Sequence, residues 1–161
     1  MELYLLRHGI AEDQRAGESD SSRPLTSEGQ KKLASVLRRA YESGAAPTLI
    51  LSSPYLRAVQ TARAAADIFH YQGEIIQTKC LTPDGTPQNV WNEIREHRSE
   101  PAILLAGHEP LLSQLVAYVL ASLTLRVEMK KATLVRIDLD GARSQPHGIL
   151  RWMLTPALVG K

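Results

Sequence analysis

The sequence predicts an α/β fold, a three-layer αβα sandwich with a mostly parallel central sheet and an antiparallel edge from the C-terminal strands. The first observation is a set of short apolar runs, at 3–6, 48–52 and 102–106, without the alternation of a half-exposed strand. Such runs are typical of parallel strands covered on both faces. The second is that segments with helical spacing of apolar residues separate them. The third is a pair of strand-like runs at 132–139 and 149–154, joined by a loop with an Asp-Gly turn.

The composition is that of an ordinary soluble globular protein. The chain has 161 residues, of which 43% are hydrophobic and 22% charged, and this favours a single domain over residues 1–161. Its net charge of +2 is too small to indicate a nucleic-acid partner, and the densest basic stretch, 126–131, is broken by Glu128. Because Cys80 is the one cysteine, the chain can form neither an intrachain disulfide nor a thiolate zinc site.

The N-terminal residues do not form a secretory signal, because no basic region precedes a long apolar core. The most apolar later stretch, 110–127, is interrupted by polar residues and suits a buried helix better than a membrane span. We therefore expect a cytoplasmic protein with no membrane partner. The sequence does not determine the oligomeric state, and a monomer is the simplest expectation.

The first strand ends abruptly at chemically active residues. Arg7 and His8 follow the last apolar residue directly, and Gly9 lets the chain turn sharply. In open α/β sheets, ligands bind at this carboxyl end of the strands. Taken alone, the motif has another interpretation, in which Arg7 solvates the strand end and His8 is a satisfied turn histidine. The polar loop that follows, 11–23, has a length typical of functional loops.

The next elements alternate between helix and strand. Thr26 is suited to cap a helix that Gly44 closes. After the second strand, Ser53 at the cap and Pro54 at the first helical position predict another helix, with Arg57 in its first turn. The remaining predicted elements are, in order, a strand at 74–78, a helix from Thr86-Pro87, a strand at 102–106 and a helix from 110 to about 122.

Three strands thus deliver a cation or an imidazole to the same end of the sheet. Arg7 and His8 follow the first strand, and Arg57 lies one turn beyond the second. His108 follows the strand at 102–106. Arginine offers planar bidentate donors for phosphate oxygens, and the amino end of the second helix adds free N–H groups. The arrangement predicts a site for a phosphate dianion.

Other chemistries found in α/β chains lack their motifs here. There is no glycine-rich loop of a dinucleotide or nucleoside-triphosphate site, and no Gly-x-Ser-x-Gly nucleophile elbow. His108-Glu109 imitates the start of a His-Glu-x-x-His zinc motif, but Leu112 stands where the second histidine belongs, so no zinc site of this type is expected. The other histidines have no ligand-like spacing and are interpreted as surface or loop residues: His70, His97 and His147.

Four motifs carry a resemblance to a known family. They are Leu6-Arg7-His8-Gly9, Arg23-Pro24-Leu25-Thr26-x-x-Gly29, Ser52-Ser53-Pro54-x-x-Arg57-Ala58-x-Gln60-Thr61 and Gly107-His108-x-Pro110. In this order they resemble the histidine phosphatase superfamily, also called phosphoglycerate-mutase-like, over nearly the whole chain. The short length and two further segments resemble its phosphohistidine phosphatase SixA branch: Ser19-Asp20-Ser21-x-Arg23-Pro24-Leu25-Thr26 and Leu81-Thr82-Pro83-x-Gly85.

The resemblance implies that His8 is the nucleophile, which takes the phosphoryl group on a ring nitrogen and loses it to water. It implies that the phosphate oxygens are held by Arg7, Arg57 and His108. Gly9 and Arg23 are further candidates for binding the substrate. The chemistry agrees, because a histidine with an ordinary pKa near 6.5 is largely neutral, and so nucleophilic, at neutral pH. Positive neighbours keep it neutral and stabilise the charge of an in-line phosphoryl transfer. No metal or other cofactor is expected.

The loop after the third strand departs from the family pattern. Many members have a glutamate there that protonates the leaving oxygen, whereas this chain has Pro83. Asp84 and Glu109 are the candidate proton donors nearby, and each also suits a turn or a rim carboxylate. A pocket without a dedicated acid favours a leaving group of low basicity, such as the imidazole of phosphohistidine, over an alkoxide.

The expected partner is therefore a phosphohistidine-bearing protein, and the resemblance implies a phosphorelay histidine domain. The predicted elements leave few residues for a lid over the site. Arg23 could contact such a substrate or anchor its own loop. Two other functions stay open: a general phosphomonoesterase that uses Asp84 or Glu109 as its acid, and a non-catalytic phospho-group binding module, which would need donors but no nucleophile.

Overall fold

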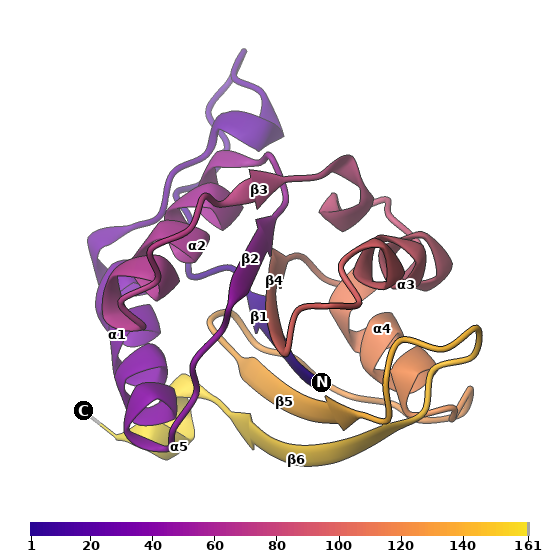
Figure 1. Cartoon of the computed structure of the whole chain (residues 1–161). Helices are drawn as coiled ribbons and strands as arrows, with labels where there is room; N and C mark the ends of the chain where they lie inside the picture. The colour runs from indigo at the N-terminus through magenta and orange to yellow at the C-terminus, as the bar shows by residue number, and fades with distance from the viewer. Residues whose placement is uncertain (161) are drawn as a thin grey trace.

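The apolar runs form the inner strands of one six-stranded sheet (Figure 1). The computed structural model describes residues 1–160. The strand order is β3-β2-β4-β1-β5-β6; the first four are parallel, and β5 is antiparallel to both of its neighbours. The strands are β1 (Glu2–Arg7), β2 (Leu49–Ser52), β3 (Ile76–Gln77), β4 (Ala102–Gly107), β5 (Leu134–Leu139) and β6 (Gly148–Leu154). This confirms the predicted fold class.

Helices cover both faces of the sheet, because alternate residues of a buried strand point to opposite faces. Leu3 and Leu5 of β1 belong to one apolar core, with α3 (Pro87–Glu96) and α4 (Leu111–Val119). Tyr4 and Leu6 belong to a second core on the other face, with α1 (Ser27–Glu42) and α2 (Leu56–Ile68) (Figure 1). The short elements are η1 (Asp20–Ser22), η2 (Lys79–Leu81) and α5 (Pro156–Val159).

Helix starts depend on threonine caps at two of the predicted places. The hydroxyl of Thr26 accepts a hydrogen bond from the Gly29 N–H at 2.9 Å, and that of Thr86 accepts one from the Asn89 N–H at 3.3 Å. Each bond satisfies an N–H that has no partner within its own helix.

The start of α2 differs from the prediction. The helix begins at Leu56 rather than Pro54, and Tyr55 is its cap residue. The Ser53 hydroxyl accepts a hydrogen bond from the Tyr55 N–H at 3.3 Å and lies 2.8 Å from His108 Nε2. The backbone is extended at Tyr55, with φ of −65° and ψ of 135°, and the helix begins at the next residue.

Two other boundaries also differ. α4 ends at Val119 rather than near residue 122, because Ala121 has a left-handed backbone with φ of 52°. β3 covers only Ile76–Gln77 of the predicted 74–78, since the hydroxyl of Thr78 caps η2 instead of extending the edge strand.

β4 is the central strand for the site, since it pairs in parallel with both β1 and β2. Arg7 lies opposite Gly107, and Ser52 lies opposite Ala106. Three strands therefore end at the same level, and the residues that follow them converge over the end of β4.

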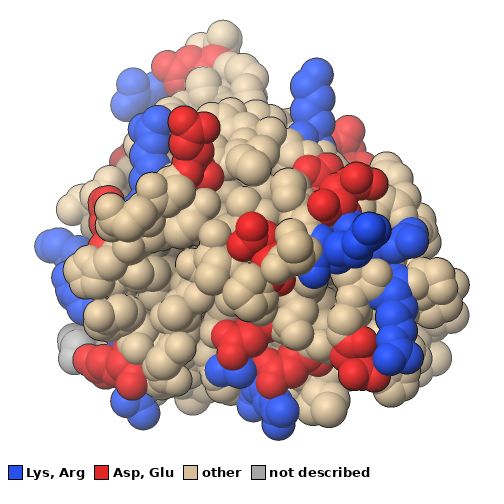
Figure 2. All heavy atoms as spheres, in the orientation of Figure 1, with Lys and Arg blue, Asp and Glu red and all other residues tan. Residues whose placement is uncertain are grey.

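The surface in Figure 2 carries basic and acidic side chains interspersed, with no broad region of one sign on this face. Such a mixed face does not offer the basic stripe that binds a nucleic-acid backbone. Within residues 1–160, no helix has both the length and the apolar character needed to cross a membrane.

Candidate active site

His8 directly follows β1 and its side chain is only 6% exposed. Its Nδ1 lies 2.7 Å from the carbonyl oxygen of Gly9. A carbonyl can only accept a hydrogen bond, so Nδ1 carries the proton and donates it. The lone pair of the neutral ring is therefore on Nε2, which accepts a 3.4 Å hydrogen bond from Arg57 Nε. The ring atom with a lone pair is therefore Nε2.

Gly9 joins the turn after His8 to α2. Its N–H donates to the Thr61 hydroxyl at 3.2 Å, and that hydroxyl donates to the Arg57 carbonyl at 2.7 Å. A Cβ on Gly9 would lie 3.2 Å from the carbonyl oxygen of Gly29 in α1. The lack of a side chain lets this turn pack closely between two helices.

Arg57 is 4% exposed and presents its guanidinium to His8. Nη1 donates to the Asp20 carbonyl oxygen at 2.7 Å, and Nη2 donates to Asp20 Oδ2 at 3.0 Å. The guanidinium also lies 5.0 Å from the centre of the Tyr55 ring. Since Asp20 occupies the Nη1–Nη2 edge, the edge that carries Nε faces the His8 ring.

His108 brings a second imidazole to the same place. It is 1% exposed, and its ring centre lies 5.1 Å from that of His8 and 5.1 Å from that of Tyr55. Nε2 is bonded to the Ser53 hydroxyl, whereas Nδ1 is buried with no hydrogen-bond partner among the described residues.

Arg7 closes the site from the β5 side. Nη1 donates to the Met129 carbonyl oxygen at 2.6 Å, and Nε is buried without a partner among residues 1–160. No direct hydrogen bond joins Arg7 to His8, but the charge of Arg7 contributes to lowering the pKa of both His8 and His108.

Both imidazoles are held neutral. Burial lowers the pKa of His8 to about 4; the Gly9 hydrogen bond opposes this, and the charges of Arg57, Arg7 and Lys131 add to it. Burial also lowers the pKa of His108 to about 3, with further contributions from His8 and Arg57. At neutral pH the His8 ring is therefore unprotonated at Nε2 in the folded chain.

These shifts predict that the protein loses stability when the pH falls from 6.5 towards 4. In this window the unfolded chain binds protons on His8 and His108 that the folded chain does not bind, so the free energy of unfolding rises with pH. Each ring contributes up to about 1.4 kcal/mol per pH unit. Urea unfolding at pH 7 and pH 5 measures the effect.

The control for the pH dependence uses glutamine in place of histidine. His8→Gln and His108→Gln should each flatten the slope, and His70→Gln, at an exposed position, should leave it unchanged. A wild-type free energy of unfolding that is equal at both pH values would contradict the assignment of two neutral buried rings.

Asp20 is the acidic residue of the site that the sequence analysis did not identify as functional. Besides Arg57, its carboxylate binds Arg23, whose Nε and Nη2 both lie 2.8 Å from Oδ1. Burial works to raise the pKa of Asp20, but the bonds and charges of Arg23 and Arg57 prevail and lower it. Asp20 is therefore ionised at neutral pH.

Arg23 makes the contacts of a loop anchor. In addition to Asp20, it donates from Nη1 to the Glu12 carbonyl oxygen at 2.8 Å. These bonds connect η1 to the loop residue Glu12. Contact of Arg23 with a substrate stays a prediction.

The two carboxylates predicted as proton donors make local contacts. Asp84 accepts a hydrogen bond from the Thr82 hydroxyl at 2.7 Å and lines a surface hollow together with Lys79. Glu109 accepts one from the Ser113 N–H at 2.9 Å, in the first turn of α4. Among residues 1–160, neither has a hydrogen bond to His8, and no group of three metal-ligating side chains is present.

Comparisons with known proteins agree with this geometry. A family model described as "Histidine phosphatase superfamily (branch 1)" matches residues 3–82. An uncharacterized protein of Picosynechococcus sp. is 34% identical over 152 residues, which are 91% of this chain and 90% of the relative. The phosphohistidine phosphatase SixA of Escherichia coli is 29% identical over 160 residues, 97% of this chain and 94% of the relative.

A solved structure extends the similarity to three dimensions. The protein histidine phosphatase SixA, complexed with tungstate, superposes with a TM-score of 0.88 at 25% identity. The match covers 99% of this chain and 100% of that one. The fold is therefore shared with SixA over nearly the full length of both chains.

Proposed function

The chain belongs to the histidine phosphatase superfamily, and on this premise we propose that it hydrolyses protein N-phosphohistidine through a covalent intermediate on Nε2 of His8. The observation that carries the proposal is the state of the His8 ring. Its proton is fixed on Nδ1 by the Gly9 carbonyl, and Nε2 faces a guanidinium in a buried site. A module that only bound a phospho-group would need donors, whereas this ring presents a lone pair.

The unpartnered donors around His8 support a phosphate ligand. Arg7 Nε and His108 Nδ1 are buried without partners among the described residues, and each such group costs about 1–3 kcal/mol unless it is satisfied. Phosphate oxygens would accept hydrogen bonds from both. The related SixA binds tungstate, a tetrahedral oxyanion of the same class.

Ser53 would set the proton on His108. Its hydroxyl already accepts from the Tyr55 N–H, so its own proton is free to bond to His108 Nε2. The remaining proton of the neutral ring is then on Nδ1, the nitrogen that lacks a partner. His108 would donate from this atom to the phosphate.

The first step forms the bond between His8 Nε2 and phosphorus and breaks the phosphorus–nitrogen bond of the substrate. The bonding pair leaves with the substrate imidazole, which departs neutral because its other ring nitrogen carries a proton. In the second step water attacks phosphorus, the bonding pair of the phosphorus–nitrogen bond returns to Nε2, and inorganic phosphate leaves as H2PO4⁻ with both protons of the water. The Gly9 carbonyl keeps the Nδ1 proton in place, so that His8 also departs as a neutral imidazole. In this scheme Arg7 and Arg57 neutralise the charge on the phosphate oxygens, and the neutral ring of His108 donates a hydrogen bond to one of them.

The absence of a close carboxylic acid predicts the choice of substrate. An alkoxide needs a proton as it leaves, and Asp84 and Glu109 are both engaged elsewhere. Asp20 is ionised and bonded to two arginines, so it is a poor acid. We expect kcat/KM for a phosphohistidine peptide to exceed that for a phosphoserine peptide of the same sequence by at least about 100-fold. Phosphate release measures both.

Equal rates on the two peptides would favour the general phosphomonoesterase, in which Asp84 or Glu109 supplies the proton. Asp84→Asn and Glu109→Gln separate these outcomes. Under the present proposal neither substitution lowers the rate on phosphohistidine more than about threefold, which is less than the smallest usual contribution of a general acid. A physiological donor of the phosphorelay type fits this chemistry.

A further inference from the structure

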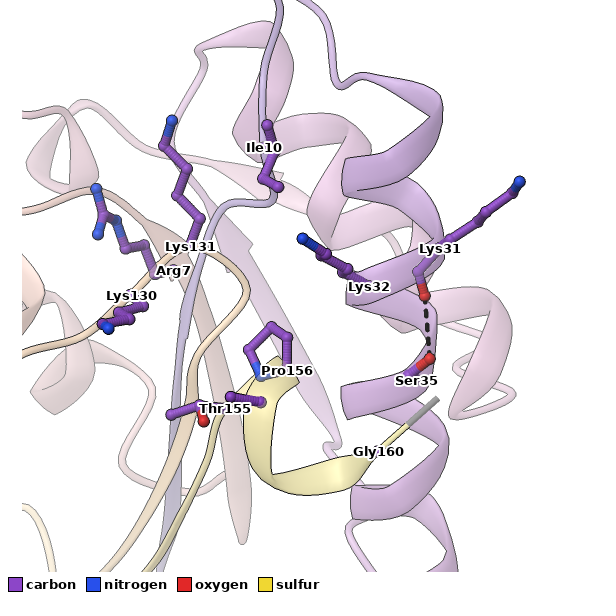
Figure 3. Close-up of a pocket in the computed structure, with 11 residues that line it drawn as sticks. Arg7, Ile10, Lys31, Lys32, Ser35, Lys130, Lys131, Thr155, Pro156 and Gly160 are labelled. Carbon is purple, nitrogen blue, oxygen red and sulfur yellow. Dashed lines mark hydrogen bonds between the residues drawn. The ribbon is translucent and has the colours of Figure 1, made fainter.

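A groove beside the carboxyl end of β1 has only cations among its charged lining residues. It has a volume of about 910 Å³ and lies between α1, the turn at 130–131 and the segment that contains α5 (Figure 3). Its charged residues are Arg7, Lys31, Lys32, Lys130 and Lys131. The apolar part of its lining comes from Ile10, Pro156 and Ala157. This single sign contrasts with the mixed charges in Figure 2.

The groove adjoins the candidate active site at one shared residue. Arg7 belongs to both, and the charge of Lys131 helps to lower the pKa of His8. The turn that carries the lysines is fixed to the strand end, because the Ala132 N–H donates to the His8 carbonyl at 3.1 Å. The Thr133 N–H also closes the turn onto the Lys130 carbonyl at 2.9 Å. A ligand in the groove would therefore lie next to a phosphoryl group on His8.

The lysines are largely free to meet an anion. Lys32 extends into the groove towards Ile10, whereas Lys31 leaves α1 on its other side and points away from the groove (Figure 3). Lys32 pairs with Glu28 at 2.6 Å, but both side chains are largely exposed and such a pair is weak. Within residues 1–160, no carboxylate lies within ion-pair distance of Lys31, Lys130 or Lys131.

We propose that this groove binds an acidic segment of the protein substrate, next to the phosphohistidine whose phosphoryl group His8 receives. The proposal rests on the proposed function and adds to it the chemistry that selects the partner. Asp and Glu side chains would meet the lysines at the rim, and apolar residues of the same segment would cover Ile10 and Pro156. Because the net charge of the chain is only +2, the attraction comes from this local cluster.

The test compares two phosphohistidine peptides that differ only at their flanking residues, one with Asp and Glu and one with Asn and Gln. Wild-type kcat/KM for the acidic peptide should be about tenfold higher at low ionic strength, and the difference should shrink in high salt. The double variant Lys31→Glu/Lys32→Glu should abolish the preference. The control is Arg38→Glu/Arg39→Glu, two turns further along α1, which makes the same change of charge outside the groove. This variant should retain the preference for the acidic peptide.

The outcomes separate the groove from the catalytic proposal. Hydrolysis of both peptides at equal rates by wild type would overturn the groove proposal alone, and so would an equal loss of preference in the two double variants. If neither peptide is hydrolysed, the proposed function fails. The groove can then still be tested by fluorescence anisotropy. This measures the binding of an acidic peptide that carries a stable phosphoryl-triazole in place of phosphohistidine. If a single-stranded oligonucleotide displaces the labelled peptide but an unlabelled acidic peptide does not, the groove is a nucleic-acid site. This result would contradict the proposal.

Discussion

Replacing His8 by alanine is expected to lower kcat/KM for a phosphohistidine peptide by at least about 10⁴-fold. The substitution removes the only neutral imidazole whose lone pair faces Arg57, and without it no covalent intermediate can form. The remaining cations would still bind phosphate, so the peptide should bind while turnover stops. Steady-state phosphate release measures the loss.

The control for this prediction is His147→Ala, which removes an exposed imidazole from a loop and should leave the rate unchanged. Because His8 is buried, His8→Gln provides a second variant that keeps more of the side-chain volume, and its near-ultraviolet circular dichroism reports whether the fold persists. A folded His8→Gln protein with more than a tenth of the wild-type rate would show that another group is the nucleophile.

Replacing Arg57 by lysine should lower kcat/KM by about 10³-fold even though the positive charge is kept. The guanidinium holds Asp20 with Nη1 and Nη2 and presents Nε to His8, and an ammonium group cannot reproduce this planar set of donors. Arg63→Lys, an exposed position on the same helix, is the matched control and should be silent.

The same geometry predicts a smaller effect at Asp20, which we interpret as a positioning residue. Asp20→Asn keeps the backbone carbonyl bond to Arg57 but weakens the side-chain bond. The rate should fall about tenfold, mainly in kcat, because the guanidinium of Arg57 is positioned less precisely.

A rate for Arg57→Lys within a factor of three of wild type would contradict the proposed role of the guanidinium.

The grouping of His8, Arg57 and His108 could be predicted from sequence because it depends on topology. Continuous apolar runs identify buried parallel strands, and parallel strands place their following residues at one edge of the sheet. The structure brings these three side chains together over β4, which pairs with both β1 and β2. Their catalytic roles stay a proposal.

The contacts of Asp20 could not be predicted in the same way. It lies in a polar loop without periodic residues. Its position depends on Arg23, which bonds both to the Asp20 carboxylate and to the Glu12 carbonyl, and only the folded chain makes these bonds. The motif that contains Asp20 was visible in the sequence, but nothing in it indicated that the carboxylate would meet Arg57.

Ser53 shows a different limit. A serine before proline at the end of a strand predicts a helix cap, and here the same hydroxyl accepts from the Tyr55 N–H and also bonds to a histidine 55 residues later in the chain. Neither the bond to this distant partner nor the start of α2 at Leu56 could be predicted from the local sequence. Likewise Ala121, which has no local preference for left-handed backbone, ends α4 earlier than its apolar pattern predicts.

The most direct test of the account is the identity of the phosphorylated atom. Rapid mixing with a phosphohistidine peptide, an alkaline quench and phosphorus–nitrogen correlation by NMR would locate the phosphoryl group on the trapped enzyme. The account predicts phosphorus on Nε2 of His8, since Nδ1 is protonated and bonded to Gly9. Phosphorus on Nδ1 or on another residue, or turnover with no phosphoenzyme at all, would contradict it.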